Sequence, residues 1–149
     1  MRFRTGALAV CIGAAALTIG CGGEQPGVDL QITGPFSAHL LGNQASCSPA
    51  PAGEAPGTIA SFAVLANGLP YDLQFLTSRI GAGTYAVSVA GTFVAFNGDG
   101  PGWSTLDDHS GDLVVNRDGR SGTLNVALSS EPGSTSAPIH ISGSWRCPA

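Results

Sequence analysis

The chain has 149 residues, with six arginines, no lysine and ten acidic residues, and its net charge at pH 7 is −4. Nucleic-acid backbones are bound by clustered lysine and arginine, so this composition argues against a nucleic-acid partner. The absence of lysine also excludes Schiff-base chemistry and a phosphate-binding P-loop.

Residues 1–20 are typical of an export signal. Arg2 and Arg4 form a basic start, and a run of mostly small apolar residues follows. The run is shorter than the ~20 apolar residues that cross a bilayer, and it is rich in glycine and alanine. We therefore expect a signal peptide here and no membrane-spanning helix.

The end of this signal resembles the lipobox of bacterial lipoproteins. Gly20 and Cys21 close the apolar run, with Thr18 in place of the more usual leucine. The resemblance implies cleavage before Cys21 and a diacylglycerol on its sulfur, which makes the membrane the expected partner. Two acyl chains, at about 0.8 kcal/mol per buried methylene, give lasting attachment. Two alternatives stay open: modification at Cys11, disfavoured by the branched residue before it, and an ordinary secreted protein.

The remaining residues, 21–149, have a length that suits one domain. Four arginines and ten acidic residues remain after the signal, a net charge of −6. Residues 21–27 are expected to be a short lipidated tether, and residues 28–149 a single β domain.

Two cysteines are left once Cys11 leaves with the signal and Cys21 carries lipid. Cys47 and Cys147 are expected to form a disulfide in an oxidising exported compartment. Such a bond would close a loop of about 100 residues and stabilise the fold by about 4–5 kcal/mol in the chain-entropy model. Metal binding by the two cysteines is the weaker alternative, because no histidine lies at a suitable spacing.

Short extended segments separated by glycine-rich turns follow one another along the domain. The irregular, proline-containing segment 46–57 is predicted to be a surface loop. The pair Asn67-Gly68 predicts a hairpin lengthened by the following proline, and a bulge or bend is expected at Gly91. The predicted strands cover residues 28–33, 36–41, 58–66, 71–77, 84–96, 112–116, 122–129 and 139–147.

Alternation within these segments predicts which side chains form the core. In one strand Tyr71, Leu73 and Phe75 share a face at period two, with polar residues opposite. In the last strand, Trp145 and Cys147 point the same way as the preceding isoleucines. About eight short strands and no helical period predict an all-β antiparallel β-sandwich or small barrel, stapled by one disulfide.

Three segments, Arg79–Tyr85, Asp118–Leu124 and Ile141–Cys147, share glycine-turn and strand signatures. Their pattern resembles one found in small lipoproteins of uncharacterised function from high-GC bacteria such as actinobacteria. The resemblance implies an anchored β domain in the cell envelope. It carries no catalytic residue over to this chain.

The strongest candidate for chemistry is an acidic stretch between two predicted strands. Calcium takes six to eight oxygen ligands, and a loop folded back on itself would offer several carboxylates, although the spacing matches no EF-hand. A solvated acidic loop is the alternative. A hydrolase triad built with His109 and Ser110 is weaker, because no Gly-x-Ser-x-Gly elbow is present. The candidate ligand or calcium residues are Asp99, Trp103, Asp107, Asp108 and Asp112.

Other single residues carry weaker signals. Trp103 is expected in a loop, where it would stack on a sugar or enter a membrane interface, and Trp145 is expected in the core. His39 and His140 face away from the apolar residues of their strands and are expected at the surface. Arg117 and Arg120 beside the later hairpin turn are expected to be solvated at an exposed tip.

Three classes of function follow. The first is a non-enzymatic envelope lipoprotein that presents a surface to a partner protein, the second a module that binds a small ligand, a glycan or calcium, and the third a small hydrolase. No cofactor is expected. A cavity lined by Phe36, Phe62, Phe75 or Phe93 would favour the second class, and a filled interior with an exposed apolar or acidic patch the first.

Overall fold

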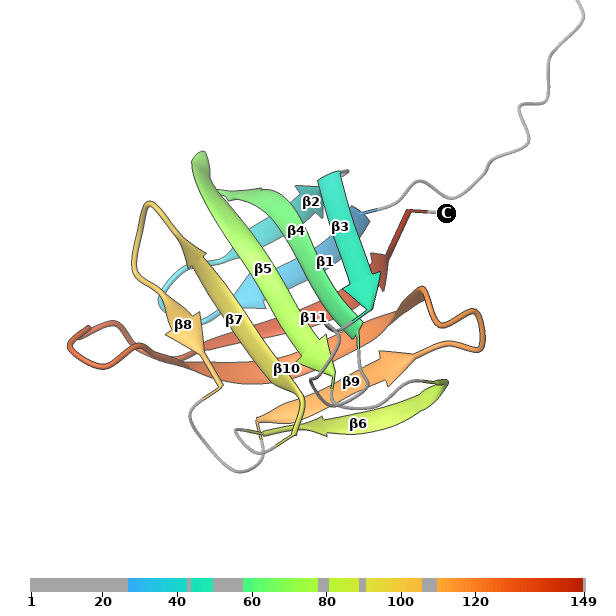
Figure 1. The fold of residues 1–149 in the computed structure, drawn as a ribbon. Coiled ribbons are helices and arrows are strands. Elements are labelled where there is room, and N and C mark those ends of the chain that lie inside the picture. Colours follow the sequence, from blue (N-terminus) through green and yellow to red (C-terminus); the bar gives the residue numbers. More distant parts are fainter. Residues whose placement is uncertain are drawn as a thin grey trace, which may run out of the picture.

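The computed structural model describes residues 27–42, 44–49, 58–77, 81–88, 91–105 and 110–148. The regular elements of these residues are all β-strands (Figure 1). They are β1 (Gly27–Thr33), β2 (Ala38–Gly42), β3 (Gln44–Pro49), β4 (Thr58–Ala66), β5 (Leu69–Thr77), β6 (Gly83–Val87), β7 (Phe93–Gly98), β8 (Trp103–Ser104), β9 (Gly111–Val115), β10 (Ser121–Ser130) and β11 (Ile139–Arg146).

The strands form one antiparallel sheet that curls into a nearly closed barrel. Its order is β2-β1-β11-β10-β8-β7-β5-β4-β3. The two ends of this order meet because β2 and β3 are separated by a single residue and act as one bent strand: β2 pairs with β1, and β3 pairs with β4. Counting this bent strand once, eight strands go round the barrel. The predicted all-β antiparallel fold is confirmed, in its barrel form.

Strands β6 and β9 extend the sheet beside the barrel. The long strand β10 pairs with β9 over its first half and with β8 at Ser129 and Ser130. Strand β6 pairs with β9 and is the lowest strand in Figure 1. The sequence predicted one extended run over 84–96 with a break at Gly91. The structure confirms the break, since β6 ends at Val87 and β7 begins at Phe93.

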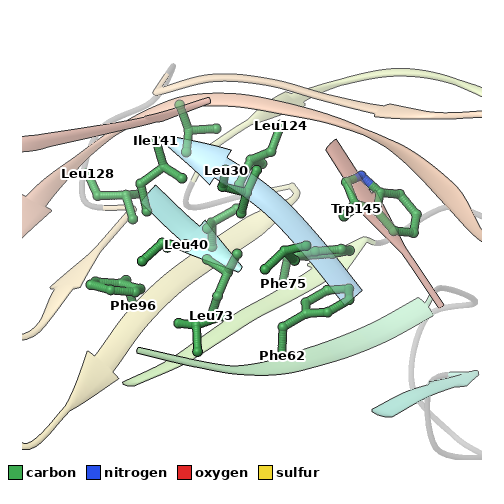
Figure 2. Packing of buried hydrophobic residues seen from close by; sticks show 14 of the residues in the cluster. Leu30, Leu40, Phe62, Leu73, Phe75, Phe96, Leu124, Leu128, Ile141 and Trp145 are labelled. Atoms are coloured by element: carbon green, nitrogen blue, oxygen red, sulfur yellow. The ribbon is translucent and has the colours of Figure 1, made fainter. Parts of the chain in front are cut away.

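The core consists of the inward side chains of the barrel strands. As predicted, Tyr71, Leu73 and Phe75 are buried, while Asp72 and Gln74 between them are exposed. Figure 2 shows leucines and aromatic rings from opposite sides of the barrel in contact across its interior. The fully buried large side chains include Phe62, Phe96, Leu30, Leu40, Leu113, Leu124, Leu128 and Ile139.

One end of this core is aromatic. The ring of Phe75 packs against Phe62 at a centroid distance of 5.5 Å and edge-on against Trp145 at 5.0 Å. Trp145 is 3% exposed, which confirms the prediction that it belongs to the core.

The predicted disulfide is present between Cys47 in β3 and Cys147 just after β11. Their Cα atoms are 5.8 Å apart and 100 positions apart in the sequence. Cys147 is also held by its backbone, whose N–H donates to the carbonyl oxygen of Arg120 at 2.7 Å. The bond therefore ties the bent strand to the end of the last strand. Part of the predicted 46–57 loop is strand instead, because β3 continues to Pro49.

Candidate functional site

The connections between strands gather at two ends of the barrel. At one end, called the tether end here, lie the start of β1 at Gly27, the turn 116–120 and Cys147, since Gly27 is opposite Arg146 and Cys147 bonds to Arg120. The connections 34–37, 67–68, 99–102 and 131–138 lie at the other end, called the hollow end. In Figure 1 the hollow end is on the left and the C-terminus on the right.

A small depression lies at the hollow end. Its volume is about 280 Å³. We call it the aromatic hollow, and its lining residues are Pro35, Phe36, Ala66, Asn67, Leu69, Tyr71, Pro101, Trp103 and Ser136.

The aromatic rings of the hollow form one packed group. Phe36 lies 5.7 Å from Trp103 and Tyr71 lies 6.5 Å from Trp103, between ring centroids. Below them Phe96 stacks on Tyr71 at 4.4 Å with an interplanar angle of 5°. The indole N–H of Trp103 donates to the carbonyl oxygen of Ala137 at 2.9 Å, so this donor is already used within the protein. The hollow therefore offers mainly apolar surface.

A second depression runs along the outside of the barrel next to the hollow. Its volume is about 470 Å³, and Tyr71 lines both depressions. We call it the leucine groove, because Leu41 and Leu65 on its walls are 63% and 61% exposed. Its lining residues are Leu41, Gly42, Ala63, Val64, Leu65, Pro70, Tyr71, Asp72, Asn97, Gly98 and Asp99.

The β4–β5 hairpin places the apolar side chains between the two depressions. Asn67 and Gly68 have φ angles of 51° and 82°, the positive values that a tight two-residue hairpin turn requires. The predicted Asn-Gly hairpin is therefore present, and it is shorter than expected, because Leu69 and Pro70 already belong to β5. Leu69, 45% exposed, lines the hollow, while Leu65 on the other strand lines the groove.

The charged groups at this end are acidic. Asp72 and Asp99 line the groove, and the carboxylate of Glu131 lies 3.2 Å from the side-chain amide group of Asn97. The backbone N–H of Glu131 donates to Gly102 next to Trp103. Burial, with a smaller contribution from the Asp99 carboxylate, raises the pKa of Tyr71 above its ordinary value of 10.0. This phenol is therefore neutral at physiological pH.

The described arginines lie at the opposite end. Arg117 and Arg120 are exposed in the turn after β9, as predicted, and Arg146 ends β11. In the same turn Asp118 accepts hydrogen bonds from the hydroxyl of Ser121 and from backbone N–H groups. The barrel therefore has an acidic, apolar end and an end that carries arginines.

The sequence placed Trp103 in a loop, and this placement is wrong. Trp103 belongs to β8, pairs with Phe96 and Ser130, and is only 2% exposed. Three glycine and proline residues before it suggested a loop, but that segment is a tight connection that returns the chain directly to the barrel. Trp103 forms part of the hollow's wall and is not a projecting ring.

The other candidate residues are not brought together by the described part of the chain. Asp99 follows β7 at the hollow end, whereas Asp112 lies in β9 opposite Ala86 and Asn125. Among the described residues, no three histidine, cysteine, aspartate or glutamate side chains are grouped to hold a metal ion. Asp107, Asp108 and His109 lie outside these residues, as does the lipidation candidate Cys21, and the calcium site stays a prediction.

Both predicted surface histidines are exposed. His39 lies 2.6 Å from the carboxylate of Asp29, between Nε2 and Oδ1, on the outer face of the sheet. His140 lies opposite Thr33 and Ala127 on the same sheet. Neither residue lines the hollow or the groove.

No family model matches the chain, and no curated protein or solved structure matches it. In the part of the chain that the structure describes, no helix has the length and apolar character needed to span a membrane.

Sequence reasoning missed the aromatic hollow. Its rings come from three distant segments, and only the fold brings them together. A signal was present, since Phe36, Tyr71 and Trp103 each lie within two residues after a proline in a turn-forming segment. In an antiparallel barrel every second turn lies at the same end. Aromatic residues beside such turns are therefore expected to meet at one end of the barrel.

Proposed function

We propose that this protein is a non-enzymatic lipoprotein of the cell envelope, anchored through Cys21, that presents its hollow end as an interaction surface. The observation that carries this proposal is the exposed apolar surface formed by Leu65 and Leu69 around the two depressions, which Leu41 extends along β2 toward the tether end. Exposed apolar patches with polar rims mark interaction sites in soluble domains.

The packed interior favours an interaction surface over an internal ligand site. Phe62 and Phe75, two of the residues that would have lined an internal cavity, are 0% and 2% exposed and lie against one another in the core. Small barrels that hold a ligand leave space for it in the barrel interior. Here side chains from both halves of the sheet meet in that space (Figure 2).

The position of β1 indicates which end of the barrel would face the membrane. The strand starts at Gly27 at the tether end and runs for seven residues toward the hollow end. At about 3.3 Å per residue it covers about 20 Å. A lipid on Cys21 would attach the barrel by its tether end, and the hollow end would then face away from the membrane.

The charges fit this orientation. Arg117, Arg120 and Arg146 lie at the end that would face the lipid headgroups. Anionic headgroups attract such residues within about 10 Å of the surface at ordinary ionic strength. The acidic hollow end would be repelled by the same surface.

Intact mass spectrometry of the protein extracted from its native membrane tests the anchor. The expected mass is that of residues 21–149 with an acylglycerol, and it should increase by the mass of two hydrogens on reduction of the disulfide. A Cys21→Ser variant should be released from the membrane fraction. An unlipidated native protein that starts at another residue would contradict the proposed anchorage.

A second candidate function is a small-ligand or glycan module. One observation favours it: the hollow is lined by Phe36 together with Tyr71 and Trp103. Native mass spectrometry of gently purified protein would then show a bound small molecule that is lost in a Leu69→Asp variant. If the protein is recovered without a bound molecule and neutral sugars leave its tryptophan fluorescence unchanged, this candidate fails.

A further inference from the structure

We propose that the hollow and the groove dock a basic polypeptide segment that carries an aliphatic or aromatic side chain. This inference rests on the proposed interaction surface and names the chemistry of its partner. The apolar side chain would enter the aromatic hollow, and the flanking basic residues would face the acidic rim.

The two depressions adjoin one another at Tyr71. Tyr71 lines both, and the β4–β5 hairpin contributes Leu69 to one and Leu65 to the other. Leu41 extends the apolar area onto β2. An apolar centre with a charged rim is the usual composition of a protein-binding site.

The size of the hollow suits one side chain. At about 280 Å³ it has room for one aliphatic or aromatic side chain. Its floor is closed by the packed rings of Tyr71, Phe96 and Trp103. An acyl chain would need a deeper channel than these rings leave, so the hollow fits the side chain of a larger partner.

The groove crosses four strands, β2, β4, β5 and β7. Strand β2 pairs with β1 along one edge, and its other edge contacts β4 with no ladder between them in the described residues. Leu41 and Gly42 on this side, and Ala63 to Leu65 on β4, line the groove. Asp72 on β5 and Asn97 on β7 continue the same lining, so the groove is wide enough for several residues of an extended polypeptide.

The charge at this end selects a basic partner. Asp72, Asp99 and Glu131 surround the apolar surface, and the described arginines lie at the other end of the barrel. Residues 21–149 carry a net charge of −6, so the whole domain attracts cations as well. Complementary charge increases the rate of encounter and excludes acidic partners.

The test uses the intact protein in phosphatidylcholine nanodiscs, because neutral lipid does not itself bind basic peptides by charge. Three six-residue peptides are compared by calorimetry: Lys-Lys-Leu-Phe-Lys-Lys, its counterpart with four glutamates, and its counterpart with two serines in the centre. We expect binding of the first alone, weakened by added salt. Equal binding of the glutamate or serine peptide, or no binding of the first, would overturn the proposal.

Variants then locate the bound peptide. Leu65→Ser and Leu69→Ser should together weaken binding about tenfold or more, since a tenfold change corresponds to about 1.4 kcal/mol and the two leucines lose apolar surface that the peptide would bury. Asp99→Asn with Glu131→Gln should weaken it about threefold, as expected for exposed ion pairs. The matched control is Phe93→Ser on the outer face of β7, because Phe93 is 38% exposed and lines neither depression. Unchanged unfolding midpoints show that each variant is folded.

A crosslinking experiment distinguishes failure of the basic-partner inference from failure of the proposed interaction surface. A photoreactive group placed at position 65 should crosslink to a basic partner segment on intact cells. Crosslinks to an acidic or neutral segment would overturn the basic class and leave the interaction surface in place. A protein that carries lipid but shows neither crosslink nor peptide binding at this end would contradict both the inference and the proposed surface.

Discussion

Cys47 in β3 and Cys147 after β11 join two strands that are not neighbours in the hydrogen-bonded order of the sheet. Strand β3 pairs only with β4 among the described strands, so its other edge has no ladder. The disulfide connects this edge region to the end of β11, which continues the pairing around the barrel through β1 and β10. A covalent bond thus closes the barrel at a place where backbone hydrogen bonds do not.

Replacing both cysteines with alanine should lower the free energy of unfolding. The bond closes a loop of 100 residues, for which the loss of unfolded-state entropy gives about 4–5 kcal/mol as an upper value. Urea unfolding followed by tryptophan fluorescence measures the change. A reducing agent should lower the midpoint of the wild-type protein and leave the double variant unaffected. Equal urea midpoints for the wild-type protein and the double variant without reducing agent would mean that the disulfide does not stabilise the closed barrel.

Much of the fold could be predicted because it depends on local patterns. The alternation at Tyr71, Leu73 and Phe75 requires only a strand with one buried face, and the Asn67-Gly68 turn requires only two positive φ angles. The disulfide was predicted by elimination, since only Cys47 and Cys147 remained once Cys11 was assigned to the expected signal and Cys21 to the expected lipid anchor.

The rest depends on contacts between distant segments. Trp103 follows Pro101 and Gly102, and no local pattern shows that a two-residue strand buries it against Phe36 and Tyr71. The hollow could likewise not be predicted from the sequence, because its lining comes from four connections that meet only when the barrel closes.

A large-to-small change in the aromatic core should be severe, while one on the outer face should be mild. Phe75→Ala removes a ring that is 2% exposed and packs between Phe62 and Trp145, so we expect a loss of about 3–5 kcal/mol. Phe93→Ala, on a neighbouring strand but 38% exposed, should cost less than about 1 kcal/mol. Chemical denaturation of the two variants makes the comparison. Similar losses would mean that Phe93 has a structural role beyond its exposed position.

The Asp118 turn should make stability depend on pH in the acidic range. The hydroxyl of Ser121, the N–H groups of Arg120 and Ser121, and the nearby Arg146 favour the carboxylate and lower the pKa of Asp118 below its ordinary 3.8. A lowered folded-state pKa contributes stability above the unfolded value of 3.8, and this contribution is lost as the pH falls through the folded value.

Asp118→Asn should therefore destabilise the protein at neutral pH, and the difference from wild type should shrink as the pH falls below 3.8. Thermal unfolding of both proteins across this range measures the difference. A gap of constant size at every pH would show that the carboxylate's charge is not the cause. A Ser121→Ala variant should raise the pKa of Asp118, measured by its carboxyl resonance, because the largest of the causes is removed.

Tyr71 should titrate above its ordinary value in the folded protein. Burial raises its pKa first, and the Asp99 carboxylate adds to the shift. The chain has two tyrosines, so in a Tyr85→Phe variant the phenolate absorbance reports Tyr71 alone. We expect a midpoint above 10.0, and a lower midpoint when Asp99→Asn is added, although burial should keep it raised.

The same shift should appear as an alkaline loss of stability. A raised folded-state pKa contributes stability below the unfolded value of 10.0, and this contribution is lost as the pH rises through the folded value. Tyr71→Phe has no phenol to ionise, so its unfolding midpoint should fall less steeply above pH 10.0 than that of the wild-type protein. Parallel declines for the two proteins would mean that the Tyr71 phenol ionises as easily in the folded state as in the unfolded chain. The hollow would then be wetter, and its aromatic floor less closed, than docking of an apolar side chain requires.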